Sequence, residues 1–294
     1  MSQDMTLVLL QQAVNGLAVG CIYGLVALGF VLIYKATEVV NFAQGDILMF
    51  GAFAAWTVIA TLDLPYWLAF PLIVLLTAFL GAGLDMLVMR PIVGQPQFAG
   101  IMLTIGLAFT IRGLVSMFWG PESRSFDTPF SNKTTALAGL VVSDVTISIV
   151  AGTIVMTVLL FAFFRFTRLG VAMQAASQNQ LAAYLMAIPV KTVNSLVWGI
   201  SAGVSAAAGI LLAPALTVEV NLWFVVLKGF GAAILGGFGS IPGALLGGIL
   251  IGLAEQFVGF YLPSAKGITA YAVLLAVLIL YPKCLFGSGE RKRV

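Results

Sequence analysis

One pentapeptide of the chain matches a catalytic motif. Gly199-Ile200-Ser201-Ala202-Gly203 fits the G-x-S-x-G pattern of a nucleophile elbow, in which an exposed serine attacks a carbonyl group. Such an elbow needs a strand before the serine and a histidine that activates its hydroxyl group. Here the pentapeptide lies in an apolar helical stretch, and the 294-residue chain contains no histidine. We therefore expect Ser201 to be structural and predict that the chain is not an enzyme.

Nucleotide and metal chemistry are missing from the sequence as well. The chain contains no G-x-x-x-x-G-K-[ST] run, the loop that cradles nucleotide phosphates. If ATP hydrolysis powers its function, another chain must hydrolyse the ATP. Cys21 lies in an apolar run and Cys284 near a basic tail, so we expect neither a disulfide nor a zinc site. We predict that the chain itself binds no metal and no cofactor.

Four charged residues stand inside long apolar runs, where a charge is costly and normally faces a cavity or a partner group: Asp46, Arg112, Lys228 and Glu255. Counted at 1.5 Å per helical residue, Asp46 lies about 10 Å inside its run from the inner end. Arg112 lies in the outer third of another run. Lys228 and Glu255 lie at similar depths, so they could pair. For these two and Arg112 we favour pairing or snorkelling, with path lining as the alternative.

A polar cluster precedes Asp46. Asn41 and Gln44 are one helical turn apart, and Gly45 loosens the backbone beside them. Such a cluster at the start of an apolar run suggests a cavity, and a helix cap at an interface is an equal alternative. The candidate residues of a translocation path are therefore Asn41, Gln44, Asp46, Lys228 and Glu255.

The elements that hold these residues are predicted to be membrane-spanning helices. Hydrophobic residues make up 61% of the chain and charged residues only 9%, which is too little charge for a soluble surface. Spans of about 20 apolar residues are predicted at roughly 10–34, 39–61, 66–89, 98–119, 145–164, 192–215, 222–238, 243–262 and 267–282. The seventh is short and rich in glycine, so a broken or re-entrant segment is possible there. We predict an all-α polytopic membrane protein with eight or nine transmembrane helices in a single domain, residues 1–294.

The basic residues predict the orientation of the spans. Residues 1–4 contain no Lys or Arg, so we interpret the first run as a retained span rather than a signal peptide. Basic residues then fall in alternate loops and in a tail at 283–294: Lys35, Arg90, Arg165, Arg168, Lys191, Lys283, Arg291, Lys292 and Arg293. Placing them in the cytoplasm puts the N-terminus and the long polar loop 120–144 outside. This orientation needs an odd number of crossings, which favours nine.

Glycines recur at helical spacing in two spans. Gly16, Gly20 and Gly24 lie four apart in the first span, and the eighth repeats the spacing in two pairs, Gly243 with Gly247 and Gly248 with Gly252. Small residues at this spacing let helix backbones touch within lipid. We expect close packing there, with a role in helix motion as the alternative.

The segment 167–190 is too polar in its middle to cross a membrane, and basic residues flank it. It is therefore predicted to be cytoplasmic. On one helix, small residues would form a single stripe, which suits docking into a partner's groove: Ala172, Ala175, Ala176, Asn179, Ala183 and Met186. Pro189 would end that helix. A helix lying on the bilayer surface is the alternative.

At this point the chain resembles the LivH-like permeases of branched-chain amino acid ABC importers over nearly its whole length. The resemblance rests on Asn41-Phe42-Ala43-Gln44-Gly45, on Thr167-Arg168-Leu169-Gly170, on Ala182-Ala183 with Ile188, and on Gly252-Leu253-Ala254-Glu255. Its strongest part is the run 228–244, KGFGAAILGGFGSIPGA. The glycines of that signature include Gly229, Gly231, Gly236, Gly237, Gly239 and Gly243.

The resemblance implies one part of a larger importer in a bacterial inner membrane. A second, LivM-like permease would complete the path, two cytoplasmic ABC ATPases would hydrolyse ATP, and a periplasmic solute-binding protein would deliver the solute. No nucleic acid is implied. Residues 168–188 would be the coupling helix that grips the ATPases, with matching positions at Arg168, Gly170, Asn179, Ala182, Ala183 and Ile188.

The chain departs from the family in this helix. Val171, Gln174 and residues 179–181 are neutral where charges are usual, and Ala187-Ile188 stands where Gly-Ile is common. We therefore expect a docking surface with little charge that recognises a dedicated ATPase pair.

The solute stays open at this stage. The family includes importers of branched-chain amino acids, urea, short amides, and aromatic or other acids. An apolar path with few charges suits a neutral or zwitterionic solute. The alternative function is a secondary transporter driven by an ion gradient, which would need ionisable groups such as Asp46 or Glu255 at the midplane.

Overall fold

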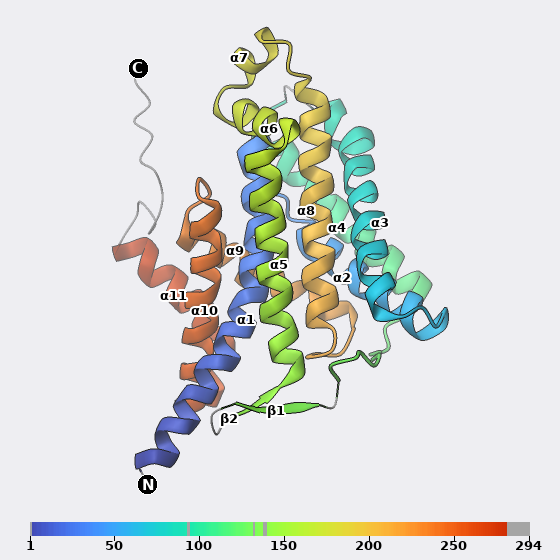
Figure 1. Cartoon of the computed structure of the whole chain (residues 1–294). Helices are drawn as coiled ribbons and strands as arrows, with labels where there is room; N and C mark the ends of the chain where they lie inside the picture. Colours follow the sequence, from blue (N-terminus) through green and yellow to red (C-terminus); the bar gives the residue numbers. More distant parts are fainter. Residues whose placement is uncertain (1, 93–94, 132, 138–139, 281–294) are drawn as a thin grey trace.

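The computed structural model describes residues 2–92, 95–131, 133–137 and 140–280. These residues form a bundle of helices with a small hairpin at one end (Figure 1). We call that end, which also holds the N-terminus, the hairpin end, and the opposite end, which holds α6 and α7, the α7 end. The predicted tail at 283–294 and Cys284 lie outside the described residues.

The helices of the bundle are α1 (Ser2–Thr37), α2 (Gln44–Trp56), α3 (Tyr66–Leu84), α4 (Gln97–Trp119), α5 (Asp144–Phe166), α6 (Arg168–Gln178), α7 (Gln180–Leu185), α8 (Val190–Leu212), α9 (Val225–Gly236), α10 (Ile241–Tyr261) and α11 (Lys266–Leu280). Single turns extend several of them: π-helical Thr57–Thr61 and Asp85–Met89, and 3₁₀-helical Arg90–Ile92, Val220–Phe224 and Pro263–Ala265. The strands β1 (Thr134–Leu137) and β2 (Leu140–Ser143) pair antiparallel, with Thr134 opposite Ser143.

Eight helices in the described part of the chain are long and apolar enough to cross a membrane. They confirm the prediction of an all-α polytopic membrane protein. The Gly-rich seventh segment, Val220–Gly236, is a shorter apolar helix. Just before it, Val218 pairs with Arg124 in the hairpin-end loop, and just after it, Gly239 lines a pocket with Lys35 and Gln174 at the α7 end. This segment therefore runs from one end of the bundle to the other rather than turning back.

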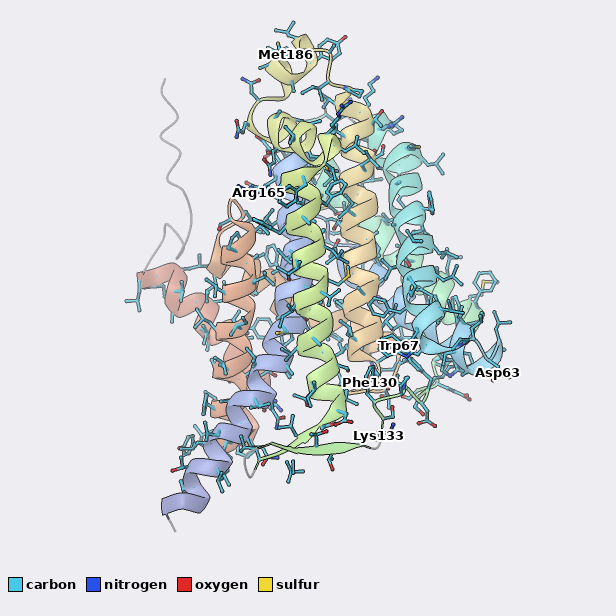
Figure 2. All side chains as sticks on the ribbon, in the orientation of Figure 1. Asp63, Trp67, Phe130, Lys133, Arg165 and Met186 are labelled. Carbon is cyan, nitrogen blue, oxygen red and sulfur yellow. The ribbon has the colours of Figure 1, made fainter. Side chains whose placement is uncertain are left out.

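The basic residues of the predicted inner loops gather at the α7 end. Lys35 and Arg165 line one pocket there, Arg168 begins α6, and Arg90 donates to the carbonyl oxygen of Lys191 (3.3 Å). Figure 2 shows Arg165 and Met186 toward this end and Asp63 and Lys133 toward the other. The charge asymmetry used to orient the chain therefore exists in the fold.

Glycines bring α1 and α10 into backbone contact, as their spacing predicts. A Cβ atom on Gly248 would lie 2.3 Å from the backbone nitrogen of Gly24, and one on Gly252 would lie 2.3 Å from that of Gly20. The contact buries much of α1, while the first turns of this helix project beyond the bundle (Figure 1). Because only glycine fits these positions, α1 and α10 form one tightly packed unit.

The predicted coupling helix is two helices in the structure. Asn179 has an extended backbone (φ −156°, ψ 102°) and its side chain caps α7 by accepting from the nitrogen of Ala182 (2.9 Å). The prediction of one continuous stripe of small residues is therefore wrong. Ala176 and Ala183 are buried, while Met186 is exposed. Helix α7 also ends at Leu185, before Pro189, which instead precedes α8.

Candidate functional site

A non-helical stretch, residues 38–43, enters the bundle between α1 and α2. Asn41 and Ala43 in it are fully buried. The hydroxyl of Thr104 on α4 accepts from the backbone nitrogen of Phe42 (3.3 Å). Its one proton is shared between the carbonyl oxygens of Ile101 in the same helix (2.9 Å) and of Val40 (3.4 Å). Irregular backbone at membrane depth is tolerated where protein groups satisfy it in this way. Helix α2 therefore begins deep inside the bundle.

Gln44, the first residue of α2, joins three elements through hydrogen bonds. Its Nε2 donates to the hydroxyl of Ser201 (3.0 Å) and also contacts that of Ser205, both on α8. Its Oε1 accepts from Nδ2 of Asn41 (3.3 Å). The Ser201 hydroxyl also bonds the carbonyl oxygen of Gly29 on α1 (2.9 Å). Ser201 thus has the structural role predicted for it, inside helix α8.

The packing around Gln44 leaves no room for solute in this conformation. Asn41 and Gln44 are both 0% exposed, and a Cβ atom on Gly29 would lie 1.9 Å from Nε2 of Gln44. Of the two interpretations of this cluster, the structure favours the buried interface. A role in a path stays a prediction that requires these helices to separate.

Asp46 forms a two-pronged ion pair with Arg112 of α4. Nε of Arg112 lies 2.9 Å from Oδ1 of Asp46, and Nη2 lies 3.2 Å from Oδ2. The guanidinium group stacks on Trp223 at 3.7 Å from the ring centre, with Phe109 on α4 at 5.3 Å. The expected difference in depth between Asp46 and Arg112 is wrong, because the count treated residues 38–43 as helix although they are irregular and carry the chain deeper per residue.

Lys228 and Glu255 pair, as their similar depth suggested. Nζ of Lys228 on α9 lies 2.6 Å from Oε1 of Glu255 on α10. The hydroxyl of Tyr23 on α1 donates to Oε2 of Glu255 (2.8 Å) and accepts from Lys228 (3.2 Å). The three side chains close a hydrogen-bonded triad that ties α1, α9 and α10 together.

A third polar cluster lies at the α7 end, and sequence reasoning did not find it. The hydroxyl of Ser195, in the second turn of α8, donates to Oδ2 of Asp85 (2.5 Å) and accepts from Nη2 of Arg90 (2.8 Å). Asp85 is 3% exposed and begins the π-helical turn that follows α3. This cluster ties the end of α3 to α8 close to the point where α7 leads into α8.

The signals for the missed partners were weak. Ser201 and Ser205 are four apart on an apolar helix, a polar stripe visible in the sequence. Tyr23 and Trp223 resemble ordinary apolar residues of a membrane span, and only the tertiary structure places them beside Glu255 and Arg112.

The surface of α6 and α7 differs from the expected one. Gly170 lets α6 turn tightly against α5, since a Cβ atom there would lie 2.3 Å from the carbonyl oxygen of Phe163. Arg168, Asn179 and Ala182 are exposed, whereas Ala183 is buried and Ile188 is half-buried. Large apolar side chains dominate the outer face of α7, each at least 69% exposed: Leu181, Tyr184, Leu185 and Met186.

The Gly-rich signature fills contacts around α9. A Cβ atom on Gly236 would lie 2.0 Å from the carbonyl oxygen of Gly243, and one on Gly229 would lie 2.4 Å from Val26. Gly237 has φ 85°, which glycine adopts without strain, and it ends α9. Gly231 is less constrained, with Ile251 at 3.6 Å, and Gly239 is exposed. Most of the signature is thus structural.

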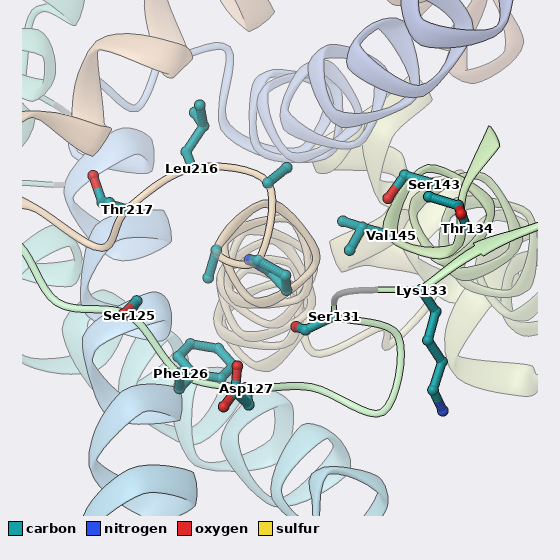
Figure 3. A pocket seen from close by; sticks show the side chains of 13 residues that line it. Ser125, Phe126, Asp127, Ser131, Lys133, Thr134, Ser143, Val145, Leu216 and Thr217 are labelled. Atoms are coloured by element: carbon teal, nitrogen blue, oxygen red, sulfur yellow. The ribbon is translucent and has the colours of Figure 1, made fainter. Parts of the chain in front are cut away.

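The hairpin end carries a polar cavity of about 620 Å³ (Figure 3). Residues of the loop before β1 line one side, and the segment 213–217 that follows α8 lines the other. Asp127 and Lys133 contribute its charged groups. Within the described residues, no group of three or more Cys, Asp or Glu side chains is arranged to hold a metal ion.

Comparison with known proteins gives a consistent result over nearly the full length. A family model described as the permease component of the branched-chain amino acid transport system matches residues 12–281. The chain is 31% identical to the high-affinity branched-chain amino acid transport system permease protein BraD of Pseudomonas aeruginosa, over 97% of this chain and 98% of that one. It is 28% identical to LivH of Escherichia coli, over 97% of each.

More distant matches extend beyond that group. The ribose import permease protein RbsC of Haemophilus influenzae is 25% identical over 81% of this chain and 76% of its own. A solved structure, PsaBC from Streptococcus pneumoniae in complex with Fab, contains a similar chain with a TM-score of 0.50 and 14% identity, covering 92% of this chain and 91% of that chain. At that identity the likeness concerns the fold alone.

Proposed function

Because this chain belongs to the family of branched-chain amino acid transport system permease components, we propose that it is one of two permease subunits of an ATP-driven importer. It would form half of the translocation path and would leave ATP hydrolysis to other chains. The absence of a phosphate-binding loop agrees with that division of labour.

One structural observation carries the proposal beyond family membership. At the α7 end, α7 stands clear of the bundle and exposes Leu181, Tyr184 and Leu185 (Figure 1). An apolar patch of this kind on a protruding helix is typical of a surface that docks into a partner's groove. We propose that this patch, rather than a stripe of alanines, grips the ATPase subunits.

The proposed orientation places the α7 end in the cytoplasm. Lys35, Arg90, Arg165, Arg168 and Lys191 gather there, as the positive-inside rule requires. The hairpin end, with its polar cavity, would then face the periplasm and receive a solute-binding protein. A second, LivM-like permease and two ABC ATPases would complete the complex in the inner membrane, with no cofactor bound to this chain.

The proposed path residues divide into two groups. Arg112, whose side chain is 21% exposed, is the strongest candidate to contact solute. Asn41, Gln44, Asp46 and Glu255 are at most 4% exposed and would do so only after the helices move. Among these candidates the Lys228–Glu255 pair should move least, because the hydroxyl of Tyr23 forms hydrogen bonds with both side chains.

The experiment is purification of the chain with its partner permease, its ATPases and its binding protein. We expect ATP hydrolysis that the loaded binding protein stimulates, and ATP-driven uptake of leucine into proteoliposomes. The double substitution Tyr184→Glu, Leu185→Glu should release the ATPases and abolish uptake, because charges replace the docking patch. The control Leu62→Glu, in an exposed loop at the hairpin end, should keep both.

Two outcomes would contradict the proposal. The first is movement of solute by the chain alone under an ion gradient, without ATPases, which is the behaviour of a secondary transporter. The second is a Tyr184→Glu, Leu185→Glu variant that retains its ATPases.

The orientation has a separate test. In a variant with both cysteines replaced by serine, a single cysteine at position 62 should react with an impermeant maleimide added outside intact cells. A single cysteine at position 185 should react only after the cells are opened. The reverse pattern would invert the proposed topology.

A further inference from the structure

The face of α9 that the other helices leave open carries a row of apolar side chains. Leu227, Phe230 and Ile234 are partly exposed, whereas Val226, Gly229 and Ala233, on the adjoining side of the helix, are buried. Two further rings extend the row, since Phe42 and Phe238 lie 5.8 and 5.9 Å from the ring of Phe230. The row runs along the bundle toward the α7 end.

Arg112 lies near the hairpin-side start of this row. Trp223, on which it stacks, precedes Phe230 by seven residues, or about 10 Å of helix. The side chain of Arg112 is 21% exposed, although Arg112 lies seven residues, again about 10 Å, inside the end of α4 at Trp119. A charged group at that depth is costly against lipid. We therefore expect this face to be covered by water or by another protein chain.

The ion pair leaves half of the guanidinium group free. An arginine side chain has five N–H donors, and Asp46 takes one from Nε and one from Nη2. No acceptor in the described part of the chain takes the other three. Two of these three, one on Nη1 and one on Nη2, form the second edge of the planar fork, which matches a carboxylate in the same two-pronged geometry. One guanidinium can thus hold Asp46 on one edge and a second carboxylate on the other.

The acids near this depth are not available in the same way. Asp46 and Glu255 are 1% and 4% exposed, and each is paired with a cation. Lys228, the other half-exposed cation, is committed to Glu255 and to Tyr23. The open face therefore presents donors for an anion and apolar surface, but no carboxylate for a cation.

From this geometry we propose that Arg112 is the specificity-determining residue of the path, and that its free N–H edge binds the carboxylate of the solute in transit. The row along α9 then receives the solute's apolar side chain. This selects small apolar carboxylates, amino acids among them, over neutral amides, urea or sugars. The inference rests on the proposed function and names the solute class for it.

Asp46 has a defined part in this role. It fixes the plane of the guanidinium group together with Trp223, and it neutralises the charge, so the solute's carboxylate binds weakly enough to leave again. A merely structural Arg112 would do no more than neutralise Asp46. The two roles differ in what happens when both charges are removed together.

The test compares the wild-type complex with the double variant Asp46→Asn, Arg112→Gln, reconstituted with its ATPases and its binding protein. Leucine is the probe, and the readout is leucine taken up per ATP hydrolysed. The double variant removes both charges; asparagine keeps the shape of Asp46, and the shorter glutamine keeps a neutral N–H donor in place of Arg112. We expect binding-protein-stimulated ATP hydrolysis within about threefold of wild type and an uptake ratio at least about tenfold lower. An unchanged ratio would overturn the proposal.

Arg112→Lys, with Asp46 intact, covers the case in which the double variant does not assemble. Lysine keeps the charge but not the fork, so the uptake ratio should again fall while ATP hydrolysis persists. A wild-type ratio in Arg112→Lys would overturn the role of the fork. If the wild-type complex itself shows no ATP-driven leucine uptake, the proposed function fails instead, which separates the two claims.

Discussion

Two interfaces between helices of the bundle, which we call seams, each contain one acid–base ion pair, but the surroundings of the two pairs differ. In the seam of α1, α9 and α10, Glu255 is buried and Lys228 is 21% exposed. In the seam of α2 and α4, Asp46 is buried and Arg112 is likewise 21% exposed. The first seam is closed by helix contacts through glycine and by the Tyr23 hydroxyl. The second has irregular backbone at residues 38–43 and a guanidinium with a free edge.

The second seam also borders an apolar groove, which adds to the difference between the two seams. An apolar cavity of about 460 Å³ lies between α2, α3 and α4, lined by Phe50, Leu84 and Ile111 among others. The seam of α1 and α10 leaves no such space, because its glycine backbones touch. We infer that α1, α9 and α10 move as one rigid unit, and that rearrangement during transport is concentrated around α2 and α4.

The largest expected effect is that of breaking the closed triad. Glu255→Leu leaves Lys228 unpaired at membrane depth and should lower the free energy of unfolding by about 3–5 kcal/mol. Asp46→Leu should cost less, because Arg112 still stacks on Trp223. Thermal unfolding in detergent, followed by size-exclusion chromatography, measures both.

The control is the double substitution Lys228→Met, Glu255→Leu, which should recover most of the loss. Equal destabilisation by Glu255→Leu and Asp46→Leu would remove the distinction between the two seams.

A smaller effect is expected from filling the glycine contact. Gly248→Val places side-chain atoms where the backbone of Gly24 lies, so α1 and α10 must separate. This should lower the free energy of unfolding by about 1–3 kcal/mol. Gly106→Val on α4 is the matched control, because no atom lies within 4 Å of a Cβ placed there. Similar melting temperatures for the two variants would show that the α1–α10 contact is not tight.

The smallest effect concerns the irregular stretch of the second seam. Thr104→Val leaves the buried nitrogen of Phe42 without its acceptor and should cost about 1–2 kcal/mol. Thr110→Val, on the same helix, removes only a hydrogen bond to Gly106 in the preceding turn and should cost no more than about 0.5 kcal/mol. Faster hydrogen exchange at residues 40–44 in Thr104→Val alone would locate the effect. Exchange that rises equally in both variants would count against a specific role of Thr104 in holding the irregular stretch.

Much of the fold could be predicted from the sequence because lipid imposes a simple length rule. Apolar runs gave the spans within a few residues, including the short seventh, and glycine spacing gave the α1–α10 contact. Counting helical rise placed Lys228 and Glu255 at similar depths, which made their pairing possible, and the structure shows the pair. That success depended on both residues lying in regular helices.

The same count failed where the backbone is irregular. No pattern in residues 38–43 predicts that this stretch is non-helical. Its hydrogen bonds are made by Thr104, which is about 60 positions away in the chain. Asn179 gave a comparable error. As a short polar residue it fits a helix surface in sequence, yet in the structure it caps α7 and splits the predicted coupling helix.

Other parts of the site depend on tertiary contacts alone. Tyr23, Trp223 and Asp85 become recognisable only when their partners are brought from other helices. Ala187 is a subtler case, since the family commonly has glycine there and the structure shows why. Its φ of 60° lies in the left-handed region that favours glycine.

The buried ion pairs also restrict how such a chain can change over generations. Losing either Asp46 or Arg112 alone leaves the other without its counter-charge at membrane depth, so we expect the second mutation to be needed soon after the first. The two codons are therefore inherited as a linked unit although 65 residues separate them. Descendants of this chain should keep both charges or have lost both.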